Sequence, residues 1–130
     1  MNLRYISWKE FDDALASMPK PICDSFYPIP RGGMVLAVAL SHRFGKPIAY
    51  LPTKLSILVD DIVDSGRTLT KTRIRYPYPA YVLCKRSSCK INAVTYGIEI
   101  LNDDWIVFPW ENKEKALEDY EQYIINQRSI

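Results

Sequence analysis

LVDDIVDSGRTLTK, residues 58–71, begins as an apolar run and then places three aspartates within five positions, at 60, 61 and 64. Like charges at this spacing repel one another, so we expect a nearby group to neutralise them. A metal ion, a sugar diol or a phosphate site would each do so. The apolar residues 55–59 that lead into the first aspartate predict a strand covered on both faces. The acidic cluster therefore follows the end of a buried strand.

The residues on either side of this stretch alternate between strand and helix patterns. The expected strands are 22–29, 47–51, 55–59 and 80–85, and the expected helices are 34–44, closed by Gly45, and 66–75. Such alternation predicts an α/β domain with a doubly wound, mainly parallel sheet and helices on both faces. Ligands bind such sheets beyond the carboxyl ends of the strands, which is where Asp60 and Asp61 lie.

The terminal parts of the chain carry separate signals. Ser7 and Glu10 form a capping-box pattern, which predicts a helix that Pro19 and Pro21 end. Further strands are expected at 94–100 and 105–108. Asn112 is the expected N-cap of a C-terminal helix over 113–127, with Leu117, Tyr120 and Ile124 on one face.

Length and composition indicate one globular domain over residues 1–130, because 48% of the residues are apolar and 25% are charged. A net charge of +2 is too small to favour nucleic acid as a partner. The three cysteines have no Cys-x-x-Cys spacing, which favours reduced thiols in a cytoplasmic protein over a zinc site. The longest apolar run, residues 34–40, is too short to cross a membrane.

Several types of site do not fit the acidic stretch. In a calcium-binding EF-hand that began at Asp60, Ile62 would occupy a ligand position. The stretch also lacks the Gly-x-x-x-x-Gly-Lys pattern of a Walker loop. A plain turn with Asp64 as N-cap explains Asp64 and Ser65, but it leaves the pair at 60 and 61 unexplained.

A phosphate site explains the whole stretch. Gly66 permits positive φ and a close approach of the backbone to a ligand. Successive N–H groups at the start of a helix bind anions, and the hydroxyls of Ser65 and Thr68 add donors. A ribose attached to that phosphate would present its hydroxyls to Asp60 and Asp61, which can also hold hydrated Mg²⁺.

ILVDDIVDSGRTL, residues 57–69, resembles the phosphoribosyl-pyrophosphate (PRPP) motif of the type I phosphoribosyltransferases. Three other stretches resemble the xanthine–guanine branch of that family in sequence and order: residues 5–18, 29–45 and 103–111. The resemblance implies transfer of phosphoribosyl from PRPP to a 6-oxopurine, with Mg²⁺ as cofactor and a dimeric or tetrameric assembly. It also implies a small hood built from the terminal segments, to which this chain adds its C-terminal helix.

The resemblance assigns roles to residues on the phosphoribosyl side of the site. The loop of Arg31, Gly32 and Gly33 matches the pyrophosphate loop, which often contains a non-proline cis peptide. Asp60 and Asp61 match the acids that face the ribose hydroxyls, and they would hold Mg²⁺ directly or through water. The 5′-phosphate loop is matched by Ser65, Gly66, Arg67 and Thr68.

On the base side, Asp64 matches the acid near the purine ring nitrogen, a candidate catalytic proton acceptor. Lys85 matches the lysine that donates to the 6-oxo group. Trp105 matches the aromatic residue that stacks on the base, and Ile106 beside it offers backbone polar groups.

One family element is missing from the sequence. Members normally carry a long mobile lid loop before the strand of the PRPP motif, whereas here only Pro52–Lys54 separates the expected strands 47–51 and 55–59. An alternative function follows: a regulatory protein that binds PRPP or a nucleotide with little turnover.

Overall fold

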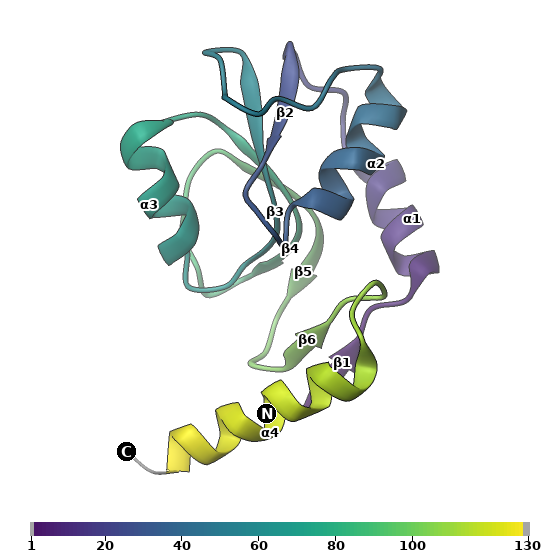
Figure 1. The fold of residues 1–130 in the computed structure, drawn as a ribbon, viewed down its shortest axis with the longest axis vertical. Helices are drawn as coiled ribbons and strands as arrows, with labels where there is room; N and C mark the ends of the chain where they lie inside the picture. The colour runs from purple at the N-terminus through teal and green to yellow at the C-terminus, as the bar shows by residue number, and fades with distance from the viewer. Residues whose placement is uncertain (1, 129–130) are drawn as a thin grey trace.

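The computed structural model describes residues 2–128 and contains a four-stranded parallel sheet with helices on both faces. The strand order is β2 (Ser25–Pro28), β3 (Ser56–Val63), β4 (Ala80–Arg86) and β5 (Val94–Ile100). Figure 1 shows α1 (Trp8–Ser17) and α2 (Met34–Phe44) on one side of the sheet and α3 (Arg67–Arg75) on the other. This arrangement confirms the predicted α/β class.

β3 is the central strand, and its sequence explains its position. Ile57 and Val59 pack into the apolar cluster under α1 and α2, while Leu58 packs into the cluster under α3. All three side chains are buried. A strand with apolar residues on consecutive positions is stable only where both of its faces are covered.

The direction of winding changes between β2 and β3. From β2 the chain passes through α2 to the outer side of β2, where Ile48 forms a single parallel bridge with Phe26. It then returns to β3 and passes through α3 to β4 on the opposite side. The loops that follow β2 and β3 therefore leave a topological switch point, where open α/β sheets bind ligands.

A second, two-stranded parallel sheet pairs β1 (Leu3–Tyr5) with β6 (Trp105–Val107). The helix α4 (Lys113–Arg128) lies alongside it. The centre of the Trp105 ring is 6.1 Å from the centre of the Tyr120 ring and 5.0 Å from that of Tyr123. These terminal segments form the hood that the resemblance implies. Residues 105–107 leave the main sheet because they pair with the first strand, which the sequence analysis did not assign.

Three expected strands differ in extent, and the first of them, expected over 22–29, covers only Ser25–Pro28. The prediction of a strand over 47–51 is wrong, because only Ile48 bridges to β2. β3 does not end at Val59 but continues through both aspartates to Val63, because β4 pairs with it along that length. The predicted capping box at Ser7 and Glu10 and the left-handed C-cap at Gly45 are both confirmed.

The connection from Ile48 to β3 is attached to the amino end of the sheet. The Thr53 hydroxyl donates to the Asp24 carboxylate at 2.8 Å, one residue before β2 begins. Arg31 follows the carboxyl end of β2, and Asp60 lies in the carboxyl half of β3. No helix within residues 2–128 is long and apolar enough to cross a membrane.

Candidate active site

Asp60 and Asp61 occupy the carboxyl half of β3. Asp60 is 8% exposed, and its Oδ1 accepts from the Asp61 backbone N–H at 2.9 Å. Asp61 Oδ1 accepts from the Ile62 N–H at 2.7 Å. Within residues 2–128, neither carboxylate forms an ion pair with a basic side chain. The two acids are therefore held by the backbone, with their charge uncompensated by the protein.

Burial raises the pKa of both carboxyl groups. The pKa of Asp60 rises to about 8, first because of burial and then because of the neighbouring Asp61 charge. The pKa of Asp61 is also raised by burial. A buried acidic pair of this kind favours either a bound cation, which supplies positive charge, or the donor groups of a ligand, which supply hydrogen bonds to the carboxylates.

We expect Asp60→Asn to stabilise the metal-free chain at high pH. The folded state holds the Asp60 proton more tightly than the unfolded state does, so stability falls as pH rises from about 4 to about 8. Asparagine removes this loss while keeping an oxygen for the Asp61 N–H, so it should gain about 2–5 kcal/mol at pH 9. Urea unfolding at pH 5 and pH 9 in the presence of a chelator measures the gain.

The control for this experiment is Asp24→Asn. Hydrogen bonds from Ser25 and Thr53 lower the pKa of Asp24, so its contribution to stability has the opposite sign. This contribution is present above the unfolded pKa and is lost as pH falls, so Asp24→Asn should destabilise the chain at pH 9. Equal pH slopes in the unmodified chain and in Asp60→Asn would contradict the raised pKa of Asp60.

The acidic pair fits the chemistry of Mg²⁺. Magnesium is usually bound through one or two carboxylates together with water and phosphate oxygens. Among the described residues, no group of three or more histidine, cysteine or acidic side chains converges as a metal cage. Asp60 and Asp61 are thus suited to a magnesium ion that shares its remaining oxygens with a substrate.

The predicted phosphate loop follows β3 and leads into α3. Gly66 is the N-cap of α3 with φ +83°, and Ser65 Oγ accepts from the Arg67 N–H at 3.3 Å. Residues 60–69 line a cavity of about 170 Å³ in front of the helix N-terminus. All seven predicted residues of this motif contribute to it: Asp60, Asp61, Asp64, Ser65, Gly66, Arg67 and Thr68. The structure thus brings the motif residues around one small cavity.

The predicted pyrophosphate loop packs against β3. The Pro30–Arg31 peptide bond is cis, as the resemblance implies for this loop. A Cβ on Gly32 would lie 2.7 Å from Asp61 Cγ, and a Cβ on Gly33 would lie 2.8 Å from the Val59 carbonyl carbon. The two glycines therefore let the loop approach the acidic pair directly.

A larger cavity of about 670 Å³ lies over this loop. Arg31, Gly32 and Asp61 line it, so Asp61 borders both cavities. The first turns of α4 also line it, through Lys115, Ala116 and Asp119. The sequence predicts an apolar stripe on this helix but not the role of these residues, since no local pattern shows where the helix docks.

Of the predicted base-side residues, Asp64 lines the smaller cavity, whereas Lys85, Trp105 and Ile106 line neither cavity. Lys85 Nζ donates to the Cys89 carbonyl at 2.6 Å and lies 5.5 Å from the centre of the Tyr96 ring. Trp105 is half-buried against α4, and Ile106 is buried. The base-binding roles of these three residues stay predictions.

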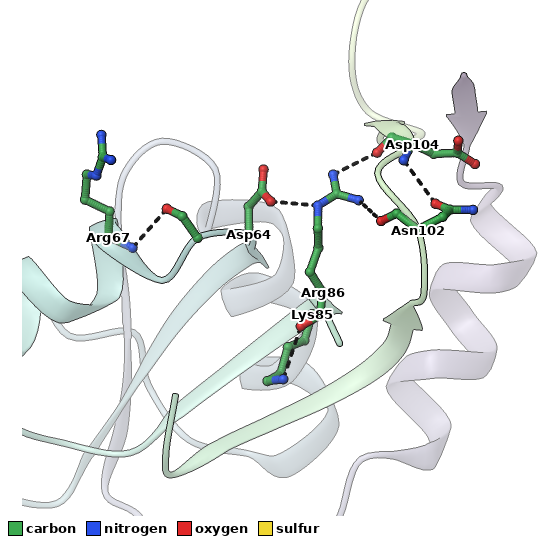
Figure 2. A network of polar contacts seen from close by, with 7 residues as sticks. Asp64, Arg67, Lys85, Arg86, Asn102 and Asp104 are labelled. Atoms are coloured by element: carbon green, nitrogen blue, oxygen red, sulfur yellow. Dashed lines mark hydrogen bonds and ion pairs between the residues drawn. The ribbon is translucent and has the colours of Figure 1, made fainter. Parts of the chain in front are cut away.

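Arg86 is a second basic residue, after Lys115, that was missed at the site. Arg86 Nε donates to Asp64 Oδ1 at 2.6 Å. Arg86 follows Lys85 in β4, and Figure 2 shows the side chains of Lys85 and Arg86 pointing in opposite directions from this strand. Side chains alternate along a strand, so Lys85 and Arg86 necessarily face different surroundings. The alternation in the sequence indicates that Arg86 faces away from Lys85, but it does not identify Asp64 as the partner of Arg86.

The relatives described here, found by sequence comparison, are named xanthine-guanine phosphoribosyltransferases. No family model matches the chain. A xanthine-guanine phosphoribosyltransferase of Vibrio vulnificus is 38% identical over 119 residues, which covers 72% of this chain and 76% of the relative. Since 72% of 130 residues is fewer than 119, the alignment contains gaps where the relative has residues that this chain lacks.

Two further matches differ in extent. The xanthine-guanine phosphoribosyltransferase of Cereibacter sphaeroides is 37% identical over 65 residues, covering 49% of this chain and only 39% of that relative. The crystal structure of a purine phosphoribosyltransferase from Pyrococcus horikoshii has a TM-score of 0.69 at 23% identity, covering 86% of this chain and 96% of the other. The structural match supports the fold, and the Vibrio match extends over more than two thirds of both sequences. The chain therefore belongs to the xanthine-guanine phosphoribosyltransferase family.

Proposed function

We propose that this protein transfers the 5-phosphoribosyl group of PRPP to a 6-oxopurine, giving a nucleoside monophosphate and pyrophosphate. The observation that carries the proposal is the position of Asp61. It borders both the cavity of the phosphate loop and the cavity over the Arg31 loop. PRPP carries a 5′-phosphate and a pyrophosphate on one ribose, so its ribose would lie between two anion-binding loops.

The proposed roles follow from this geometry. The N–H groups around Gly66, with Ser65, Arg67 and Thr68, bind the 5′-phosphate at the start of α3. Asp60 and Asp61 accept from the ribose hydroxyls, and Arg31 with the Gly32–Gly33 backbone binds the pyrophosphate. When bound at the acidic pair, Mg²⁺ supplies positive charge that stabilises the departing pyrophosphate. The reaction centre, C1 of the ribose, then faces the base side.

The base-side roles are also proposals. Trp105 stacks on the purine, Ile106 offers backbone polar groups, and Lys85 donates to the 6-oxo oxygen. Asp64 accepts the proton that the purine ring nitrogen loses when the new bond forms. Lys85 would have to exchange its bond to the Cys89 carbonyl for the substrate oxygen, a change within the reach of one flexible side chain.

We expect PRPP-dependent pyrophosphate release with guanine, xanthine or hypoxanthine and Mg²⁺, and at least about tenfold less with adenine. A lysine donor suits a 6-oxo acceptor and is repelled by a 6-amino group, and one charge-assisted hydrogen bond has this magnitude. Initial rates over a panel of bases measure the preference. Equal or faster use of adenine would contradict the assignment of Lys85, and no release with any base would contradict the proposed reaction.

A second candidate function is that of a regulatory protein that binds PRPP or a nucleotide with little turnover. The attachment of Thr53 to Asp24 favours it, because the connection that replaces the lid is held at the amino end of the sheet. Ala116 and Lys115 of α4 favour the enzyme, because they line the cavity over the pyrophosphate loop and cover part of it. Ribose 5-phosphate that accumulates from PRPP without base would indicate an open site, since lids exclude water from such centres.

The remaining expectations accompany this proposal. We propose one domain over residues 1–130 that acts in the cytoplasm as a homo-oligomer on small-molecule substrates. The three cysteines are free thiols in the structure, which supports a reducing compartment.

A further inference from the structure

Arg86, at the end of β4, makes hydrogen bonds with all three guanidinium nitrogens. Nε donates to Asp64 Oδ1 at 2.6 Å, Nη1 to the Asn102 carbonyl at 2.8 Å, and Nη2 to the Asp104 carbonyl at 2.7 Å. Figure 2 shows the guanidinium between these acceptors. The Arg86 side chain is only 13% exposed, so its contacts are screened weakly by water.

These contacts join two segments that lie far apart in the sequence. Asp64 belongs to the loop after β3, whereas the turn 102–104 leads directly into β6 and its first residue, Trp105. The turn is itself tied to the small sheet, because the Trp105 N–H donates to the Asn2 carbonyl at 2.7 Å. Arg86 thus connects the main sheet to the hood next to the start of β6, which contains the predicted base-side residues Trp105 and Ile106.

The contact with Asp64 also selects one carboxylate oxygen. Arg86 binds Oδ1, and within residues 2–128 no hydrogen bond engages Oδ2. Asp64 is otherwise a loop side chain that is 64% exposed and would rotate freely. With Oδ1 held by a charged donor, Oδ2 is the oxygen that remains to accept from a ligand.

We propose that Arg86 is a positioning residue that fixes the Asp64 carboxylate and the Trp105 turn in one mutual geometry. The inference rests on the proposed function, because Asp64 and Trp105 are the two groups proposed there to bind the purine. A base would meet a preformed acceptor and a preformed stacking surface, which lowers the entropy lost on binding. Arg86 acts through Asp64 and Trp105 without touching the base itself.

The chain offers a matched control in Arg73. Its three guanidinium nitrogens also donate to carbonyls in two separate segments: Tyr78 at 3.0 Å, and the adjacent residues Asn92 at 2.6 Å and Ala93 at 2.7 Å. None of these residues has a predicted role at the site. Arg73→Gln therefore measures the loss of stability that follows from removing three such hydrogen bonds, without an effect on binding of the purine base.

The experiment compares Arg86→Gln with Arg73→Gln by steady-state kinetics and thermal unfolding. For Arg86→Gln we expect the KM for guanine to rise about ten- to hundredfold, the scale of a charge-assisted hydrogen bond and its lost orientation. The KM for PRPP should change by less than about twofold, because the phosphate loop is unaltered. Arg73→Gln should lower the Tm without changing the KM for guanine.

Two further variants test whether Arg86 acts through Asp64. Arg86→Lys keeps the positive charge but not the planar fork, so we expect partial recovery of the guanine KM. In an Asp64→Asn background, Arg86→Gln should raise the KM for guanine much less than it does alone, since residues that act as a unit are not additive. Additive effects on the KM for guanine in the double variant would overturn the proposed route through Asp64.

The outcomes separate this inference from the proposed function. If the unmodified chain neither transfers phosphoribosyl nor binds guanosine 5′-monophosphate in calorimetry, the proposed function fails and the positioning role fails with it. If the unmodified chain is active and Arg86→Gln resembles Arg73→Gln, only the positioning role is overturned. Should Arg86→Gln not fold, Arg86→Lys gives the same comparison of the two KM values.

Discussion

Gly66→Val should reduce PRPP affinity by at least about a hundredfold, the consequence of about 3 kcal/mol of lost binding energy. Gly66 has φ +83°, which costs a residue with a side chain about 1–2 kcal/mol. An added Cβ would also lie 2.9 Å from Cys89 Sγ and 3.6 Å from Ile91 Cδ1. Valine at this position must displace the Cys89 side chain and disfavours the left-handed backbone, so we expect the loop to change conformation together with the N–H groups proposed to bind the phosphate. Isothermal calorimetry with PRPP and Mg²⁺ measures the loss.

Gly45→Val is the matched control for this variant. Gly45 has a similar φ of +67°, yet an added Cβ would meet no atom within 4 Å. It should therefore show the conformational cost of about 1–2 kcal/mol in unfolding experiments without any change in PRPP affinity. Unchanged PRPP affinity in a folded Gly66→Val protein would show that the phosphate does not bind at the start of α3.

Gly33→Val should prevent folding or lower the free energy of unfolding by about 3 kcal/mol or more. A Cβ at this position would lie 2.8 Å from the Val59 carbonyl carbon and 3.0 Å from Asp60 Cα. Both atoms belong to the backbone of the central strand, which cannot move without breaking its pairing with β4. Urea unfolding followed by circular dichroism measures the loss.

The neighbouring glycine provides the contrast. At Gly32 the three atoms nearest to an added Cβ all belong to the Asp61 carboxylate, a side chain that can rotate away. Gly32→Ala should therefore cost much less stability than Gly33→Val while it weakens Mg²⁺-dependent PRPP binding by displacing Asp61. If both variants lost the same stability and Gly32→Ala kept full affinity, the loop would have a purely structural role.

Local signals predicted much of this site. The apolar run before Asp60 identified the central strand, Gly66 identified the helix start, and the capping box at Ser7 identified α1. Each of these features depends on residues a few positions apart, so the sequence displays it directly. The motif and the Arg31 loop were expected at the carboxyl end of the sheet, and the winding of the strands brings them there.

The missed features depend on contacts between distant segments. Trp105 was expected in a strand, but its pairing with Leu3 in a separate sheet has no local signature. The short bridge at Ile48 formed where a longer strand was expected. Arg86 and Lys115 were missed for the same reason, since only the folded arrangement shows that they face Asp64 and the Arg31 loop.

The pairing of β1 with β6 has a consequence for the order in which the protein assembles. Leu3 and Trp105 are about a hundred residues apart, and closing such a loop costs about 4 kcal/mol of chain entropy. During synthesis the first strand has no partner until residues 105–107 have been made, whereas β2, β3 and β4 are already available to pair. We therefore expect the main sheet, with the loops that follow β2 and β3, to form before the small sheet of β1 and β6. We likewise expect local unfolding of the folded protein to release β1, β6 and α4 first, while the acidic pair and the start of α3 stay formed.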